Sequence, residues 1–209
     1  MPELQQRLRA GLAALDQAVA EPVQARLLAY VALLDKWNRH YNLTAVRDPA
    51  EMVSRHLLDS LALRPWLTPG ALLDVGSGAG LPGIPLAIAE PERPVTVLDS
   101  NGKKTRFMDQ VRRELSLSNL AVVQARVEQY RAPGEGFALI TSRAFAALAV
   151  MAGACDHLLA PGGRLLAMKG RYPDEELRGL PKSFNVVACQ PLAVPGGDGQ
   201  RHLVIIERA

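Results

Sequence analysis

The sequence predicts an α/β protein built on a mostly parallel sheet of seven strands, and two patterns carry this prediction. First, five short apolar runs alternate with stretches of helical periodicity, which is typical of parallel strands joined by helices that cover both faces of a sheet. These runs cover residues 71–75, 94–99, 120–125, 137–142 and 163–169. Second, two further apolar runs at 185–194 and 201–208 have no helical stretch between them. They predict an antiparallel hairpin that ends the sheet.

The N-terminal third of the chain carries helical patterns without a strand signal. Apolar residues recur every three or four positions as far as Val19, which predicts one helix. A second helix is predicted to open at Pro22 and a third at Asp48, which acts as an N-cap and is followed by proline. We therefore expect residues 1–68 to form an N-terminal helical region and residues 69–209 to form one compact α/β domain.

Composition and charge fit a globular chain rather than a disordered or membrane-spanning one. Of the 209 residues, 48% are hydrophobic and 22% are charged, and the longest apolar run, residues 144–155, is too short to span a bilayer. The chain start lacks the apolar core of a signal peptide, and Cys155 and Cys189 have no metal-site spacing. We expect a cytoplasmic monomer with two buried free thiols and no metal. The net charge of +3 allows a polyanionic partner without requiring one.

The strongest functional signal is the stretch DVGSGAGLPGIP, which follows the first predicted strand and precedes a short predicted helix. Its glycines leave room for a sharp turn and for close approach of a ligand. The spacing from Gly78 through Gly80 to Gly83, with Asp99 21 residues beyond Gly78, formally matches a dinucleotide-binding loop. A nicotinamide-dependent oxidoreductase is therefore one hypothesis.

Two residues argue against a pyrophosphate at this loop. Asp74 would face it with a negative charge, and Pro82 has no N–H to donate at the helix N-terminus. S-adenosylmethionine has no phosphate but carries a sulfonium, an amino-acid head and two ribose hydroxyls. Asp74 suits the cationic groups, and Asp99 can accept hydrogen bonds from both hydroxyls. The alternative for Asp99 is an N-cap of the helix that is predicted to begin near Asn101.

Several separated motifs make the chain similar to one known family. The stretch DVGSGAG resembles the first motif of class I methyltransferases, and more specific stretches are KWNRHYNLTAVRDPAEMVSRHLLDSL, GSGAGLPGIP, LDSNGKKTRF and SRAFA. Together they resemble the bacterial 16S ribosomal RNA guanine-N7 methyltransferases, the glucose-inhibited division protein B family, from about Trp37 to Lys169. The resemblance implies a Rossmann-like fold. It also implies methyl transfer from S-adenosylmethionine to N7 of a guanine in the 530 loop of 16S ribosomal RNA (guanine 527 in the family).

The resemblance further implies which residues contact the cofactor. Matched residue by residue, these positions are Gly76, Leu81, Val127, Glu128 and Arg143. The chemistry of the glycine loop adds Gly78, Gly80 and Asp99. Core packing is the alternative role for Val127, and a structural ion pair is the alternative for Arg143, which ends an apolar strand.

Guanine N7 has a lone pair and no proton, so its methylation needs positioning and no catalytic base. We therefore expect no catalytic residue in the strict sense, and no His, Cys or Ser constellation stands out in the sequence. An arginine bidentate to O6 and N7 would block the nucleophile, so the base must be held elsewhere. The candidate guanine or RNA contacts are Asn42, Arg143 and Lys169. His56 is a further candidate, for which we favour a structural role.

Basic residues cluster on the helix predicted after the second strand. They are Lys103, Lys104, Arg106, Arg112 and Arg113. They form either a solvated helix face or a contact to the RNA backbone. The expected partner is 16S ribosomal RNA or the small ribosomal subunit, and no membrane. A non-enzymatic RNA-binding or assembly protein on a methyltransferase fold stays open as a third hypothesis.

Overall fold

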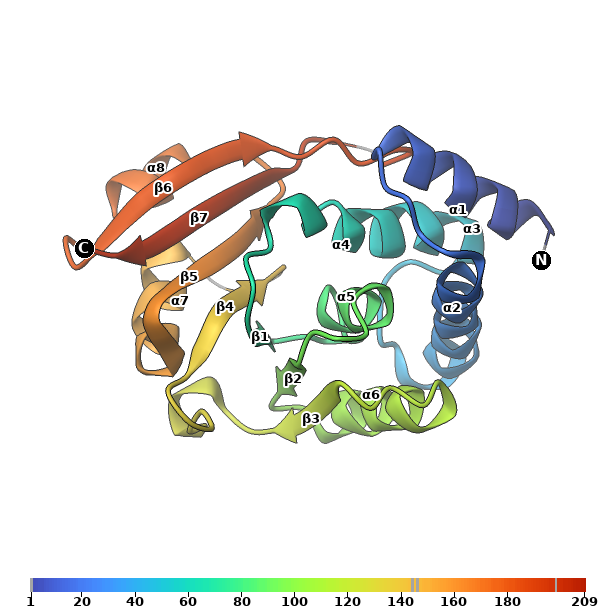
Figure 1. Ribbon diagram of the computed structural model, residues 1–209, viewed down its shortest axis with the longest axis horizontal. Helices are drawn as coiled ribbons and strands as arrows, with labels where there is room; N and C mark the ends of the chain where they lie inside the picture. Colours follow the sequence, from blue (N-terminus) through green and yellow to red (C-terminus); the bar gives the residue numbers. More distant parts are fainter. Residues whose placement is uncertain (1, 144, 146, 198) are drawn as a thin grey trace.

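The computed structural model describes residues 2–143, 145, 147–197 and 199–209. It contains one seven-stranded sheet with the strand order β3-β2-β1-β4-β5-β7-β6 (Figure 1). Strands β1 to β5 run parallel, and β7 pairs antiparallel with both β5 and β6. The predicted class, a mostly parallel sheet that ends in an antiparallel hairpin, is confirmed.

The seven strands fall on the seven apolar runs. They are β1 (Leu72–Val75), β2 (Val95–Asp99), β3 (Leu120–Gln124), β4 (Phe137–Ser142), β5 (Leu159–Lys169), β6 (Phe184–Pro191) and β7 (His202–Arg208). Strand β5 begins four residues before the predicted run at 163, because Leu159 already pairs with Phe137 ahead of a register irregularity. The apolar runs therefore locate the strands well and their ends less well.

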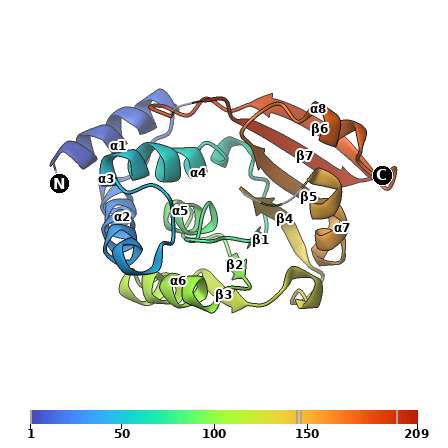
Figure 2. The same cartoon turned by 180° about the vertical axis from the view of Figure 1, so that it is seen from behind.

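Helices cover both faces of the sheet, as the alternation of patterns predicts. The longer helices are α1 (Pro2–Ala14), α2 (Glu21–Tyr41), α5 (Gly83–Ala89), α6 (Gly102–Glu114) and α7 (Leu148–Cys155). Shorter ones are α3 (Pro49–Met52), α4 (Asp59–Leu61), α8 (Asp174–Arg178) and the 3-10 turns η2 (Arg64–Trp66), η3 (Val127–Gln129) and η4 (Asp156–Leu158). Helices α1, α2, α5 and α6 lie on one side of the sheet and α7 on the other (Figures 1 and 2).

The N-terminal helices share their apolar core with one face of the sheet. Leu34 of α2 is fully buried in the same cluster as Val97 of β2 and Phe107 of α6. The buried Tyr30 hydroxyl, also on α2, donates a hydrogen bond to the carbonyl oxygen of Ala79 in the glycine loop (2.8 Å). The helical region therefore helps to hold that loop in place. A domain boundary after residue 68 stays a prediction.

Two local features of this region differ from expectation. Helix α1 ends at Ala14, and Asp16 turns the chain with a positive φ of 53°, so Val19 lies beyond the helix. Asp48 caps α3 as predicted, its carboxylate accepting the Ala50 N–H at 2.9 Å. The chain then continues as a π-helix, η1 (Val53–Leu58), which no pattern in the sequence predicted. Such wide turns are often found at functional sites.

Both cysteines are free thiols, but only one of them is buried as expected. Cys155 of α7 lies in the core, whereas Cys189 is half-buried because its strand, β6, forms an edge of the sheet. Among the described residues, no helix combines the length and apolar character needed to cross a membrane.

Candidate active site

Asp74 lies at the carboxyl end of β1 and is completely buried. Its Oδ2 accepts the N–H of Gly83 at 2.8 Å, and its Oδ1 has no hydrogen-bond partner among the described residues. Burial raises the pKa of this carboxyl to about 7. A Cβ atom at Gly83 would lie 2.9 Å from Oδ2, so only glycine lets the helix approach the carboxylate this closely. One buried carboxylate oxygen thus has no partner in the described part of the chain, although Asp74 lines neither of the two cavities described below.

The glycines of the loop serve two different purposes. Gly76 and Gly78 have positive φ values of 66° and 61°, and a Cβ atom on either would meet no atom closer than 3.8 Å. At Gly80 a Cβ atom would lie 2.3 Å from Cδ1 of Ile84. Gly80 and Gly83 therefore permit packing of α5, whereas Gly76 and Gly78 keep the front of the loop open.

Asp99 ends β2 and ties that strand to the glycine loop. Its Oδ2 accepts the Gly78 N–H and its Oδ1 accepts the Asn101 N–H, both at 2.9 Å. Lys104 lies 3.7 Å from Oδ2. The N-cap of α6 is Asn101, whose side chain accepts the Lys103 N–H at 2.9 Å. The alternative role of Asp99 as a helix cap is therefore wrong.

A cavity of about 160 Å³, here called cavity A, opens at the carboxyl ends of β1, β2 and β3. Its lining residues are Val75, Gly76, Leu98, Asp99, Ser100, Ala125, Arg126, Val127, Glu128 and Phe145. Four predicted cofactor contacts, Gly76, Asp99, Val127 and Glu128, meet here. Gly78, Gly80 and the buried Leu81 do not line this cavity, so their cofactor contacts stay predictions.

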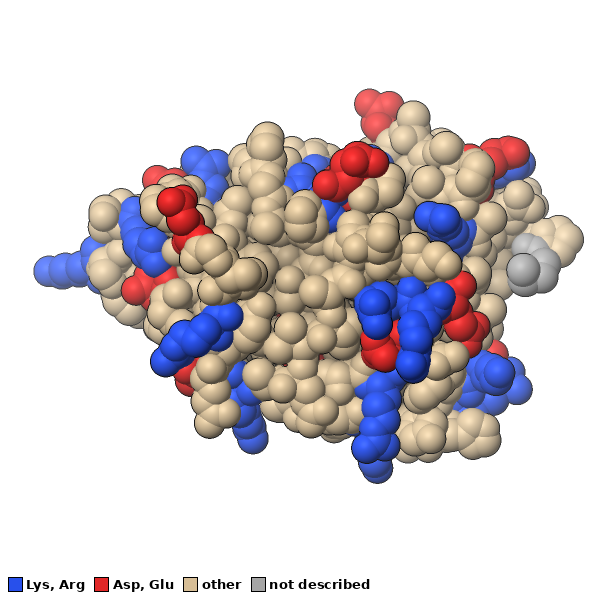
Figure 3. All heavy atoms as spheres, turned by 60° about the horizontal axis from the view of Figure 1, so that its bottom comes forward, with Lys and Arg blue, Asp and Glu red and all other residues tan. Residues whose placement is uncertain are grey.

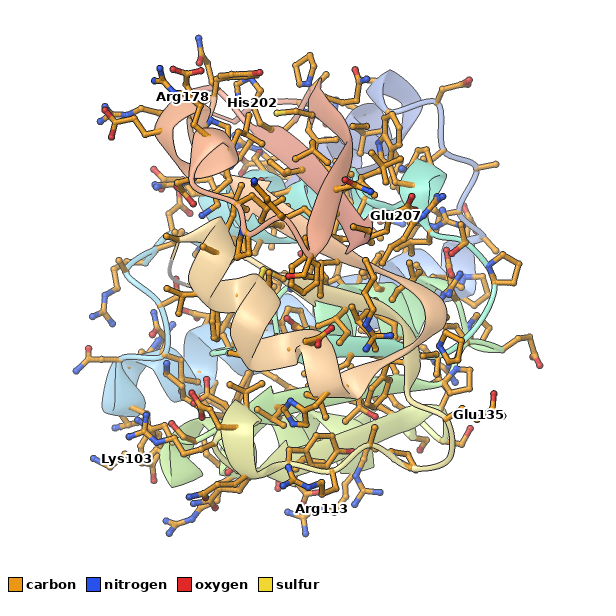
Figure 4. All side chains as sticks on the ribbon, turned by 90° about the vertical axis from the view of Figure 1, so that its left-hand side faces the viewer. Lys103, Arg113, Glu135, Arg178, His202 and Glu207 are labelled. Carbon is orange, nitrogen blue, oxygen red and sulfur yellow. The ribbon has the colours of Figure 1, made fainter. Side chains whose placement is uncertain are left out.

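A second cavity of about 360 Å³, cavity B, lies at the same edge of the sheet. It is lined by Thr44, Ala45, Val46, Arg55, His56, Asp59, Arg143, Met168, Lys169, Gly170 and Arg201. Two predicted RNA contacts, Arg143 and Lys169, therefore line the same cavity. Arg143 does not line cavity A, and its cofactor contact stays a prediction. In Figure 4, the labelled His202, next to Arg201, and Lys103 of α6 lie in the left half of the view, whereas Glu135 and Glu207 lie in the right half.

Asn42, the third predicted RNA contact, does not line cavity B. It ends α2 in the left-handed conformation, with φ 49°, and its Oδ1 accepts a hydrogen bond from Nη2 of Arg47 at 2.6 Å. Thr44, two residues further on, reaches the cavity instead. A role of Asn42 in RNA binding stays a prediction.

His56 is buried and uses both ring nitrogens. A carbonyl can only accept, so Nδ1–H donates to the Arg55 carbonyl at 2.9 Å and Nε2 accepts from the Thr44 hydroxyl at 2.9 Å. Burial, and then the nearby Arg143 guanidinium, lower the pKa of His56 to about 4. The ring is therefore neutral near pH 7 and satisfied, which supports the structural role.

Asp59 and Arg201 are site residues that the sequence did not single out. Asp59 is 1% exposed and bridges two arginines: Nη1 of Arg143 lies 3.2 Å from its Oδ2, and Nε of Arg201 lies 2.9 Å from its Oδ1. Arg143 thus has the ion pair that was its alternative role. The signal for Asp59 in the sequence was a charged residue inside the apolar stretch HLLDSLAL.

Comparison with known proteins identifies the family. A family model described as GidB, rRNA small subunit methyltransferase G, matches residues 23–204. The chain belongs to this family. It is 53% identical to the ribosomal RNA small subunit methyltransferase G of Marinobacter nauticus, over 100% of this chain and 97% of the relative. It is 59% identical to the protein of the same name from Stutzerimonas stutzeri, over 88% and 86%.

Solved structures with the same fold are methyltransferases too. The glycopeptide N-methyltransferase MtfA in complex with S-adenosyl-L-methionine superposes with a TM-score of 0.63 at 14% identity, over 74% of this chain and 87% of that chain. The ribosomal protein L11 methylase of Lactobacillus delbrueckii subsp. bulgaricus gives 0.54 at 18% identity, over 72% and 76%. At these identities the likeness concerns the fold alone.

In this GidB-family chain the basic face of α6 is partly neutralised by its own acidic residue. Arg112 and Arg113 lie 2.8 and 3.3 Å from the carboxylate oxygens of Asp109. Figure 3, which brings the β3 and α6 side of Figure 1 forward, shows basic side chains gathered beside acidic ones. Lys169 in cavity B is also paired, because its Nζ donates to Oε2 of Glu176 at 2.7 Å.

Proposed function

We propose that the chain transfers a methyl group from S-adenosylmethionine to N7 of a guanine in 16S ribosomal RNA, the guanine of the 530 loop. The observation that carries the proposal is the nearly full-length similarity to relatives named ribosomal RNA small subunit methyltransferase G. The proposal includes a monomeric enzyme that meets its RNA in the cytoplasm.

The residues of the glycine loop and cavity A fit the cofactor. Asp99 is fixed by two backbone N–H groups and still lines cavity A, so it can accept hydrogen bonds from the ribose hydroxyls. The open Gly76 and the segment at Val127 and Glu128 border the same space. The unpartnered oxygen of Asp74 suits the cationic part of the cofactor. S-adenosylmethionine, when bound, supplies an activated methyl group on its sulfonium.

The same geometry disfavours the nicotinamide alternative. A pyrophosphate needs free N–H groups at the start of α5. The Gly83 N–H is already donated to Asp74, and the Ile84 N–H to the Gly80 carbonyl at 2.7 Å. Pro82 and Pro85 have no N–H. From Pro82 to Pro85, the segment that opens α5, no backbone N–H is therefore left for phosphate oxygens.

The chain's own task in the reaction is to place the guanine, because N7 has no proton to lose. His56 lines cavity B, and both of its ring nitrogens are occupied by hydrogen bonds within the protein. This agrees with a mechanism that needs no base there. Arg143 and Lys169 border the space for the base. They must contact O6 or the RNA backbone and leave N7 uncovered.

Incubation with methyl-labelled S-adenosylmethionine tests the proposal. Both naked 16S ribosomal RNA and small subunits that lack the modification serve as acceptors, and calorimetry compares binding of S-adenosylmethionine with binding of NAD. We expect label in 16S ribosomal RNA from at least one acceptor, and no binding of NAD. RNA binding without label transfer would favour the non-enzymatic assembly protein, and NAD binding would favour the oxidoreductase.

A further inference from the structure

We propose that Asp59 is a positioning residue that holds Arg143 and Arg201 side by side in cavity B, where the two guanidinium groups receive a phosphate of the substrate RNA. The inference rests on the proposed function, since it concerns how the same enzyme holds ribosomal RNA. It adds a residue from the N-terminal helical region to the RNA site.

Asp59 joins three distant parts of the chain at one point. It begins α4 directly after the π-helix, Arg143 follows β4, and Arg201 precedes β7. The two contacts span 84 and 142 residues. Each carboxylate oxygen serves one arginine, at 3.2 Å for Arg143 and 2.9 Å for Arg201. One carboxylate therefore fixes both guanidinium groups close together.

Each arginine uses some of its guanidinium N–H groups for contacts within the protein and has others that are unused. Arg143 uses Nη1 for Asp59 and for the Arg55 carbonyl, at 2.9 Å. Arg201 uses Nε for Asp59 and Nη1 for the Gln200 carbonyl, at 3.0 Å. Nε and Nη2 of Arg143 and Nη2 of Arg201 make no hydrogen bond to any residue that the structure describes. Both side chains line cavity B and are 25% and 30% exposed, so a ligand can reach them.

The charges around this pair favour an anionic ligand. Two guanidinium groups share a single carboxylate, which leaves one net positive charge in the lining of cavity B. His56 beside them is neutral. The other cations of the lining, Arg55 and Lys169, are paired with Glu51 at 3.4 Å and Glu176 at 2.7 Å, so the surplus charge comes from the two arginines at Asp59. Adjacent guanidinium groups suit phosphate oxygens, which can accept several charge-assisted hydrogen bonds at once.

A phosphate fits the reaction better than the edge of the base does. The guanine must expose N7, and an arginine bound to its O6 and N7 would cover that atom. Phosphate contacts fix the position of a nucleic acid without covering base edges. A phosphate clamp beside the target nucleotide can therefore orient the guanine while its N7 stays free.

The substitution Asp59→Asn separates positioning from charge, because the two effects have opposite signs. Removing a negative charge from a basic cavity would by itself strengthen RNA binding. Loss of positioning weakens it. We expect the RNA concentration at half-maximal single-turnover rate, at saturating cofactor, to rise about tenfold or more, as for loss of charge-assisted contacts.

The matched control is Asp156→Asn. Asp156 also pairs with an arginine, Arg208, the last residue of β7, at 2.7 Å. Arg208 lies roughly 23 Å from Arg201, because it is seven residues further along an extended strand. The Asp156→Asn variant should leave the RNA concentration at half-maximal single-turnover rate unchanged. Equal or tighter RNA binding by a folded Asp59→Asn variant would overturn the proposal.

Arg201→Lys tests positioning even if Asp59→Asn does not fold. Lysine keeps the positive charge but lacks the planar guanidinium, which contacts Asp59 with one N–H and offers another to the RNA. We therefore expect the same rise in the RNA concentration at half-maximal single-turnover rate. Unchanged RNA binding by Arg201→Lys would contradict the clamp.

Arg201→Gln identifies the ligand group. If Arg201 contacts a phosphate, the dependence of log affinity on log salt becomes shallower by about 0.7 for a single-stranded site. An unchanged slope would overturn the phosphate assignment. Failure of the proposed function is distinguishable from both outcomes, because the wild-type chain would then methylate no ribosomal RNA at all.

Discussion

Replacing Asp99 by asparagine should weaken cofactor binding and also loosen the glycine loop. The carboxylate accepts the N–H groups of Gly78 and Asn101 with its two oxygens, both at 2.9 Å. Asparagine has one oxygen, so its amide NH₂ would face one of these two donors. The change thus removes the charge next to the ribose and leaves a backbone N–H without an acceptor.

The size of both effects follows from these contacts. Loss of a hydrogen bond to a charged acceptor costs about 1.5–3 kcal/mol, which is roughly a 10- to 150-fold weaker affinity for S-adenosylmethionine. A buried N–H without an acceptor costs about 1–3 kcal/mol of the free energy of unfolding. For a chain of this size that lowers the melting temperature by roughly 2–12 °C.

Calorimetry and thermal melting measure the two effects separately. Asn101→Ala is the matched control, because it removes the N-cap of α6 at a cost of about 0.5–2 kcal/mol and leaves Asp99 intact. We expect Asn101→Ala to lower the melting temperature without changing cofactor affinity. Wild-type affinity in a folded Asp99→Asn variant would refute the role of Asp99, and an equal loss of affinity in Asn101→Ala would show that helix α6 is responsible.

Three further predictions concern the loop, Asp74 and His56. Gly78→Ala has room for its methyl group but must keep a φ of 61°, so the variant should fold, at a cost of about 1 kcal/mol of the free energy of unfolding. By calorimetry it should bind S-adenosylmethionine more weakly than the control Gly153→Ala, a substitution with open space around it. Equal affinities of the two variants would remove the loop from the site. Burial raises the Asp74 pKa to about 7, so the affinity advantage of the wild type over Asp74→Asn should grow between about pH 6 and 8, as the carboxylate ionises. The same raised pKa adds to the free energy of unfolding of the cofactor-free wild type below about pH 4, and this addition should be lost as the pH rises from about 4 to 7. Asp74→Asn should not show this loss, and identical melting temperatures of the wild type and Asp74→Asn across this pH range would contradict the raised pKa. Because the His56 pKa is lowered to about 4, the single-turnover rate with bound cofactor should not change across neutral pH, and a rise with a midpoint near 6.5 would indicate a catalytic base.

Elements with a strong local pattern were predictable from the sequence. The buried parallel strands read as continuous apolar runs, and Asp48 followed by proline marks the start of α3, because caps and periodicity depend on neighbours in the chain. The π-helix packs against α1 and α2 and has no local signature in the sequence. Helix α1 was predicted too long because Val19 continues the apolar spacing beyond the turn at Asp16.

The site was predictable where it sits at strand ends. Gly76, Asp99 and Val127 follow successive parallel strands, whose carboxyl ends share one edge of the sheet, and they do line one cavity. Asp59 and Arg201 meet across 142 residues through the π-helix and the start of β7. No spacing along the chain indicates such a contact.

The most direct test of the central proposal is to identify the methylated atom. Ribosomal RNA that has been methylated by the purified chain is digested for mass spectrometry, and intact RNA is treated with borohydride and aniline, which cleave the chain at N7-methylguanosine. We expect one new N7-methylguanosine and one cleavage, in the 530 loop of 16S ribosomal RNA. A methyl group on an exocyclic amine or a ring carbon, or methylation spread over many guanines, would contradict the proposal.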